Sequence, residues 1–198
     1  MSSRILLAVC VAATIAGCAT QDSITLEYTP MPVNIPGLAA KTFNVSVDDQ
    51  RSYEWRQRQP PSYLGTVRDT GATRHVLNEG DRSLADQVGK DLRGELRSLG
   101  LVESYASPVA RIRVRILAWN FQATAGTYYR YLAEISVADT KGRVLESSMI
   151  QDELEVDGSA GEPMRESVSG NASRFYSGFI RKLVRENPVI LAALERGR

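Results

Sequence analysis

Cysteine and histidine are scarce in this chain. Its 198 residues include two cysteines, Cys10 and Cys18, and a single histidine, His75. A zinc site needs several Cys, His or carboxylate ligands held close together. Cys10 lies in an apolar run near the amino terminus, which leaves no cysteine pair for a disulfide in the folded body. We therefore expect no metal, no cofactor and no disulfide, and a fold that depends on its own hydrophobic core.

Long hydrophobic runs are also lacking. The apolar stretch from Ile5 to Ile15 has about half of the roughly 20 residues that a membrane-spanning helix requires. Neither sign of charge is in excess, because 24 Lys and Arg residues are matched by 23 Asp and Glu residues. A near-neutral chain of this kind argues against a nucleic acid as partner.

The motifs of common catalytic sites are missing as well. The chain has no Gly-x-Ser-x-Gly elbow and no glycine-rich phosphate-binding pattern. Paired carboxylates occur at Asp48-Asp49 and Asp152-Glu153, but neighbours on a strand point to opposite faces and do not converge on one substrate atom. We interpret these pairs as solvated strand ends and His75 as an ordinary strand or loop residue. The sequence therefore predicts a protein that is not an enzyme.

The short apolar run ends in Ile15-Ala16-Gly17-Cys18, which is a branched apolar residue, two small residues and a cysteine. The run follows a positive start that includes Arg4, the layout of a secretory signal peptide. The combination has the form of a bacterial lipobox, in which the cysteine becomes the acylated first residue. Two or more acyl chains hold a protein stably, at about 0.8 kcal/mol per buried CH₂. We predict a lipid anchor that includes palmitate at Cys18; an ordinary cleaved signal is the alternative.

The residue after Cys18 indicates in which membrane the lipoprotein is anchored. In enterobacterial lipoproteins an aspartate at this position retains the protein in the inner membrane, whereas this chain has Ala19. The resemblance implies an outer-membrane lipoprotein whose domain faces the periplasm.

Composition divides the chain into three regions. Residues 1–17 are the predicted signal peptide, which is cleaved. Residues 18–40 contain scattered Pro, Ser and Thr without sustained periodicity, and we predict the lipidated cysteine followed by an extended linker that holds the body some tens of ångströms from the bilayer. Residues 41–198 are long enough for a single domain with a real core.

Alternation of apolar and polar residues predicts the strands of this domain. The turn chemistry of Asp139-Thr140-Lys141-Gly142 indicates a hairpin between the last two of them. The expected strands are 43–47, 112–116, 129–137 and 144–156; for 63–68 and 74–77, short strands and loop remain alternatives.

Apolar residues spaced by four predict a helix that begins after the N-cap Ser83 and ends at Gly100. A second, longer helix should follow Pro163 and end at Asn187-Pro188, before a short helical tail. We therefore predict an α+β fold, in which a mostly antiparallel sheet of four to five strands carries two main helices packed on one face.

A stripe of arginines offers one candidate binding surface. Arg111, Arg113 and Arg115 alternate along one predicted strand, and Trp119 follows them. As a functional feature, the stripe with Trp119 would bind an anionic ligand such as a lipid phosphate or a glycan. As a structural feature, it is a solvent face whose charge is offset by acidic residues on the strands that should pair with it. Those acidic residues are Glu134, Asp152, Glu153 and Glu155.

The segment from Tyr53 to Pro61 offers a second candidate surface. Aromatic and arginine side chains in a long loop are typical of protein-binding surfaces. The candidate partner-binding residues are Tyr53, Trp55, Arg56 and Arg58. A loop folded over the core, with Trp55 filling a gap, is the alternative.

Several motifs follow one another in a recognisable order. An Ile24-Thr25-Leu26 lead-in to Pro36 precedes a strand that ends in Asp49-Gln50-Arg51, and Leu64-Gly65 opens the next strand. With the helix, meander and long helix that follow, the chain resembles the YajG-type lipoproteins of Gram-negative bacteria, a family of uncharacterised function. It departs from the pattern by an insertion at 53–61. The resemblance implies an envelope location and a single domain, and it carries no catalytic residues.

These observations lead to a functional hypothesis with one alternative. We expect a non-enzymatic, outer-membrane-anchored periplasmic lipoprotein that binds another envelope protein in a scaffold or accessory role. The alternative is a domain that binds peptidoglycan fragments or anionic lipid.

Overall fold

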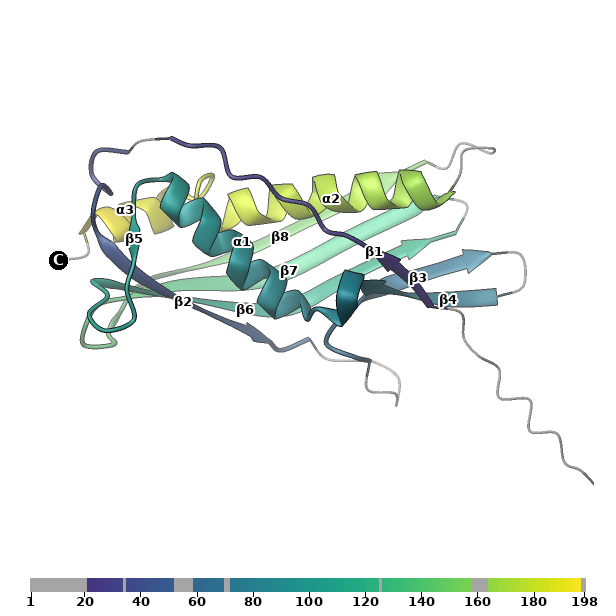
Figure 1. The fold of residues 1–198 in the computed structure, drawn as a ribbon, viewed down its shortest axis with the longest axis horizontal. Helices are drawn as coiled ribbons and strands as arrows, with labels where there is room; N and C mark the ends of the chain where they lie inside the picture. Colours follow the sequence, from purple (N-terminus) through teal and green to yellow (C-terminus); the bar gives the residue numbers. More distant parts are fainter. Residues whose placement is uncertain are drawn as a thin grey trace, which may run out of the picture.

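The computed structural model describes residues 21–33, 35–51, 59–69, 72–124, 126–157 and 164–196. In these ranges three α-helices lie on one face of a mixed eight-stranded sheet (Figure 1). The strands are β1 (Gln21–Ile24), β2 (Thr42–Asp49), β3 (Tyr63–Asp69), β4 (Ala72–Asn78), β5 (Val102–Glu103), β6 (Ala110–Ala123), β7 (Thr127–Ala138) and β8 (Val144–Val156). The helices are α1 (Leu84–Ser98), α2 (Met164–Leu183) and α3 (Pro188–Arg196), and a 3₁₀ turn at Glu79–Asp81 precedes α1. The α+β class is confirmed, but four to five strands and two helices are too few.

Strand β6 is the centre of the sheet. It runs antiparallel to β7 along one edge, and β7 in turn pairs with β8, as the predicted meander requires. The other edge of β6 pairs in parallel with two strands in succession, first β2 and then β3. Strands β1 and β5 add parallel pairs to β4 and β2. The sheet is thus mixed rather than mostly antiparallel, because period-2 alternation does not distinguish the two pairings.

Helix α1 begins and ends as its sequence indicates. The side chain of Ser83 accepts a hydrogen bond from the backbone N–H of Asp86 at 3.0 Å, which caps the helix. At the other end Gly100 adopts a φ of 94°, and the N–H of Leu101 donates to the carbonyl of Leu96. This backbone arrangement is typical of helices that end at a glycine.

An aromatic cluster holds α2 on the sheet. Trp119 of β6 stacks on Tyr131 of β7, with ring centroids 6.2 Å apart and an interplanar angle of 12°. Phe179 of α2 approaches both rings edge-on, with centroids 5.5 Å and 4.8 Å away, and Phe175 lies 5.1 Å from Tyr131. All four side chains are buried. Such aromatic pairs add to the stabilisation that comes from burial.

The amino-terminal segment 21–33 is part of the fold rather than a free linker. It leaves β1 and crosses α1 and α2 on its way to β2 (Figure 1). Ser173 and Ser177 of α2 hydrogen-bond to its backbone, and the N–H of Val33 donates to the carbonyl of Ser98 of α1. The side chains of Ile24 and Leu26, which belong to this segment, are buried in the core. The segment is extended, as predicted, and its described residues 21–33 pack on the two helices.

A buried polar network fastens this segment to the helices. Glu95 of α1 is completely buried and pairs with Arg185, which also donates to the carbonyl of Met31 at 2.6 Å. The hydroxyl of Tyr28 donates to the same carboxylate, and burial together with this hydrogen bond raises the pKa of Tyr28 above its usual value. A buried carboxylate is stable only when paired in this way. Glu95 therefore links the segment, α1 and the turn after α2.

Gly65 lies where β3 approaches β6 most closely. It pairs with Phe121, and a Cβ at position 65 would overlap the Phe121 carbonyl oxygen and lie 2.8 Å from the Phe121 ring. Backbone cannot move aside as a flexible side chain can. The Leu64-Gly65 pair thus has a structural reason, which is the parallel contact between β3 and β6.

Replacing Gly65 by alanine should lower the free energy of unfolding by roughly 1–3 kcal/mol, because overpacking displaces β3 from β6. Gly170→Ala is the matched control, since a Cβ at this α2 position meets nothing within 4 Å. It should stabilise the protein by up to about 1 kcal/mol through helix propensity. Urea unfolding followed by circular dichroism measures both, and equal effects would contradict the proposed contact.

Candidate functional site

The residues predicted to bind a partner lie between two well-defined ends. Tyr53, Trp55, Arg56 and Arg58 fall in residues 52–58, outside the described part of the chain. The structure describes Arg51 before this segment and Gln59 after it. The candidate site is therefore built from the two flanks of the segment, which we call the loop base (residues 49–51 and 59–63).

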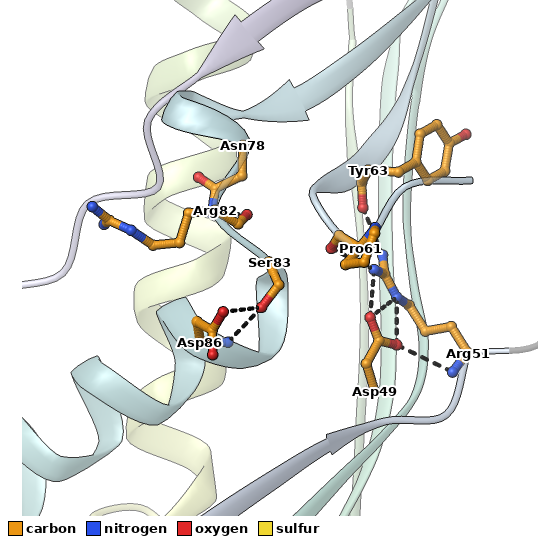
Figure 2. A network of polar contacts seen from close by, with 8 residues as sticks. All are labelled: Asp49, Arg51, Pro61, Tyr63, Asn78, Arg82, Ser83 and Asp86. Carbon is orange, nitrogen blue, oxygen red and sulfur yellow. Dashed lines mark hydrogen bonds and ion pairs between the residues drawn. The ribbon is translucent and has the colours of Figure 1, made fainter. Parts of the chain in front are cut away.

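Arg51 is the central side chain of the loop base. Its guanidinium makes a two-pronged ion pair with Asp49, with Nε–Oδ1 and Nη2–Oδ2 distances of 2.8 Å and 2.7 Å. The same group donates to the carbonyls of Tyr63, at 2.7 Å, and Pro61, at 3.2 Å. Figure 2 shows Arg51 directed toward all three residues. Because arginine has five N–H donors in a fixed plane, one side chain holds both flanks of the segment together.

The loop base is also tied to the start of α1. The carbonyl of Pro61 accepts a hydrogen bond from the N–H of Leu84, the first residue of that helix, at 3.1 Å. Close to it, Asn78 donates from its backbone to the carbonyl of Ser62 and from its side chain to the carbonyl of Arg82. Asn78, Arg82 and the cap Ser83 lie beside Pro61 in Figure 2. The loop base is thus held in place by contacts with β2, β3 and α1.

Sequence reasoning missed this arrangement. Asp49 was interpreted as a solvated strand end, and Arg51 entered only as part of a family motif. The spacing Asp-x-Arg directly after a strand was the available signal, because it allows a local ion pair across the first turn beyond the strand. The buried position of Arg51 could not be read from the sequence, since arginine is rarely buried.

The predicted arginine stripe lies on the sheet face opposite the helices. Arg113 pairs with Asp48 of β2 at 2.6 Å, and Arg115 pairs with Glu134 of β7. Arg111 is exposed, and no ion pair to it is found among the described residues. Arg113 and Arg115 are thus paired with acidic residues of the neighbouring strands, and Glu134 is one of the partners that the structural interpretation names.

Trp119 does not belong to this stripe. The register between β6 and β7 shifts between Ile116 and Ala118, so that Leu117 is an extra residue in β6. The bulge reverses the alternation, and Trp119 faces the helices although Arg115 faces solvent. Trp119 therefore lies on the opposite face of the sheet from the three arginines and belongs to the buried aromatic cluster.

The paired carboxylates do not converge. Asp48 pairs with Arg113 and Asp49 with Arg51, while Asp152 pairs with Lys182 of α2 and Glu153 with Arg130 of β7. The two carboxylates of each pair therefore point in different directions and have different partners, as expected for neighbours on a strand. Within the described residues, no group of three or more His, Cys, Asp or Glu side chains is placed to hold a metal ion.

His75 is a β4 residue. Its ring packs edge-on against Tyr63, with centroids 5.7 Å apart. Its strand position matches the interpretation of His75 as an ordinary structural residue.

No model of a known protein family matches the chain, and no curated protein matches it. Among solved structures, the chain is similar to a Xanthomonas campestris protein described as family DUF330, with 11% identity and a TM-score of 0.53 over 82% of this chain and 93% of that one. A minor lipoprotein from Acinetobacter baumannii is similar over 74% of this chain and 92% of its own, with 9% identity and a TM-score of 0.40. The first likeness shows a shared fold, and at such identities neither shows a shared function.

No helix in the described ranges has the length and apolarity that crossing a membrane requires.

Replacing Arg51 by methionine should cost roughly 3 kcal/mol of unfolding free energy, because the Asp49 carboxylate and two carbonyls lose their donor in a buried place. Arg111→Met is the control, since that side chain is exposed, and it should change stability by less than about 0.5 kcal/mol. Urea unfolding of both variants gives the comparison. Similar small effects from both would show that Arg51 does not hold the loop base.

Proposed function

We propose that this protein is a non-enzymatic lipoprotein of the bacterial envelope, anchored through Cys18, whose domain binds another envelope protein. The observation that carries the binding part is the loop base. A buried arginine, two backbone carbonyls and a helix start are used to present one seven-residue segment, and that segment contains Tyr53, Trp55, Arg56 and Arg58.

The residue types in this segment support a protein partner. Tyr, Trp and Arg are the side chains most enriched where binding energy concentrates in protein interfaces. Holding both ends of a binding segment on a rigid scaffold also reduces the entropy that is lost on association. Arg51 performs this positioning role from outside the segment.

The position of β1 supports a short connection to the membrane. Gln21 already pairs with His75 of β4, only three residues after Cys18. Three residues span at most about 10 Å, so an anchor at Cys18 would hold the domain against the bilayer rather than some tens of ångströms away. In keeping with Ala19 after the cysteine, we propose the outer membrane with the domain in the periplasm.

The alternative of peptidoglycan or anionic-lipid binding by the arginine stripe loses its support. Arg113 and Arg115 are already paired with Asp48 and Glu134, and Trp119 lies on the other side of the sheet. We therefore do not propose it.

Anchoring is tested by Cys18→Ser. This variant should no longer incorporate labelled palmitate and should move from the membrane pellet to the soluble fraction, because serine has no thiol that can form the thioether to a diacylglyceryl group. Cys10→Ser is the matched control and should behave as the wild type. Unchanged labelling and sedimentation of the Cys18 variant would rule out the anchor.

Partner binding is tested by placing a photo-crosslinking amino acid at Trp55 in the full-length chain in living cells. Lys141, an exposed residue in the turn between β7 and β8, is the control position. Position 55 should yield a discrete adduct with an envelope protein, and adding Arg51→Met should reduce that adduct several-fold. The same adducts from both positions, or none from position 55, would contradict the proposal.

A further inference from the structure

Strand β8 forms a long free edge of the sheet. The other edge strands of the sheet are short: β1 has four residues and β5 has two. By contrast β8 has 13 residues and pairs with β7 on one side, and no strand of the described ranges pairs with its other side. Such an edge presents unpaired N–H and C=O groups that can pair with another chain.

The usual devices that protect an edge strand are weak here. Val144–Val156 contains no proline, no glycine and no lysine, and its register with β7 is regular from Val156 to Glu146. Its length is about twice that of a typical strand. Val144 and Met149 are apolar side chains with exposed fractions of 59% and 54%. These features favour pairing over protection.

The acidic residues of β8 are largely neutralised by the chain itself. Arg196 of α3 pairs with Glu146 at 2.7 Å, and Lys182 of α2 pairs with Asp152 at 2.6 Å. On the opposite face Arg130 lies 3.6 Å from Glu153. Although exposed ion pairs stabilise a fold only slightly, they lower the repulsion that these carboxylates would exert on an approaching strand.

We propose that a second copy of this chain binds at this edge, with the two β8 strands antiparallel about a two-fold axis at Ile150. This proposal is independent of the anchor and of the partner that uses the loop base. All 13 residues of β8 then pair, with Val144 opposite Val156 and Ser147 opposite Glu153. The two sheets join into one continuous sheet, which is a common way for two copies to form a closed symmetric assembly.

The charges along β8 are compatible with this register and disfavour two other registers. Each acidic residue of β8 then lies opposite an uncharged residue, and Arg143 lies opposite Asp157 at both ends of the pairing. Moving the axis to Met149 would place Glu146 opposite Asp152, and moving it to Asp152 would place that residue opposite itself. Like charges directly opposite one another destabilise a strand pair, whereas opposite charges stabilise it.

Engineered cysteines test the register directly. In the proposed pairing, positions 147 and 153 of the two copies are directly opposite, with Cβ atoms about 5 Å apart. Two copies of position 147 are instead six residues apart along the strand, about 20 Å. Under mild oxidation, the full-length Ser147→Cys plus Glu153→Cys variant in detergent should form a disulfide-linked dimer. Each single variant, and the wild type with its native cysteines, should remain at background; equal crosslinking in all, or none in the double variant, would overturn the proposal.

A charge exchange tests the same pairing without cysteine. Met149 and Gln151 lie opposite one another in the proposed dimer, so Met149→Lys plus Gln151→Lys introduces two repulsive pairs by symmetry. Sedimentation equilibrium should show dimerisation weakened by about tenfold or more. Met149→Lys plus Gln151→Glu should restore it, with circular dichroism unchanged in both variants. A wild-type chain that stays monomeric, or a Lys/Glu variant no better than the Lys/Lys variant, would overturn the proposal.

Discussion

The structure depends on one strand having three partners. Strand β6 bonds to β7 along one edge, while its other edge bonds first to β2 and then to β3. Two parallel strands can share one edge only if the first ends before the second begins. The pairing of β2 ends at Ile116 of β6, the extra residue Leu117 follows, and pairing with β3 starts at Phe121. Gly65 permits the second contact, because any side chain there would overlap Phe121.

The candidate site follows from that change of partner. The chain must leave β6 at the end of β2 and return to it as β3, so the loop base lies beside the part of β6 that has a bulge and no parallel neighbour. Arg51 closes this gap by joining Asp49 at the end of β2 to the carbonyls of Pro61 and Tyr63 at the start of β3. A binding segment at this position can vary in length without disturbing the sheet, because both of its ends are fixed by the same side chain.

Local patterns were enough to predict the main helices and the longer strands, whereas β1, β5 and the long-range pairing were not predicted. The Ser83 cap, the spacing of four and Gly100 define α1, and alternation defines β6 to β8. Alternation says nothing of a parallel partner, and one extra residue at Leu117 reverses it, so that Trp119 lies on the face opposite the arginines of the same strand. The amino-terminal segment did carry a signal, since Ile24, Leu26 and Tyr28 alternate, but its partner surface is a helix pair that the sequence does not reveal.

The proposed anchor at Cys18 and the proposed β8 pairing, taken together, would restrict how two copies sit on a bilayer. A two-fold axis keeps two equivalent atoms at the same height along the axis and places them on opposite sides of it. Both Cys18 residues can reach one leaflet only if this axis is perpendicular to the bilayer. Because the axis at Ile150 is also perpendicular to the joined sheet, the sheet then lies parallel to the membrane surface, and its two faces have different surroundings. The two residues between Cys18 and Gln21 are too few to allow an upright sheet in such a dimer, since one of its two anchors would point away from the lipid.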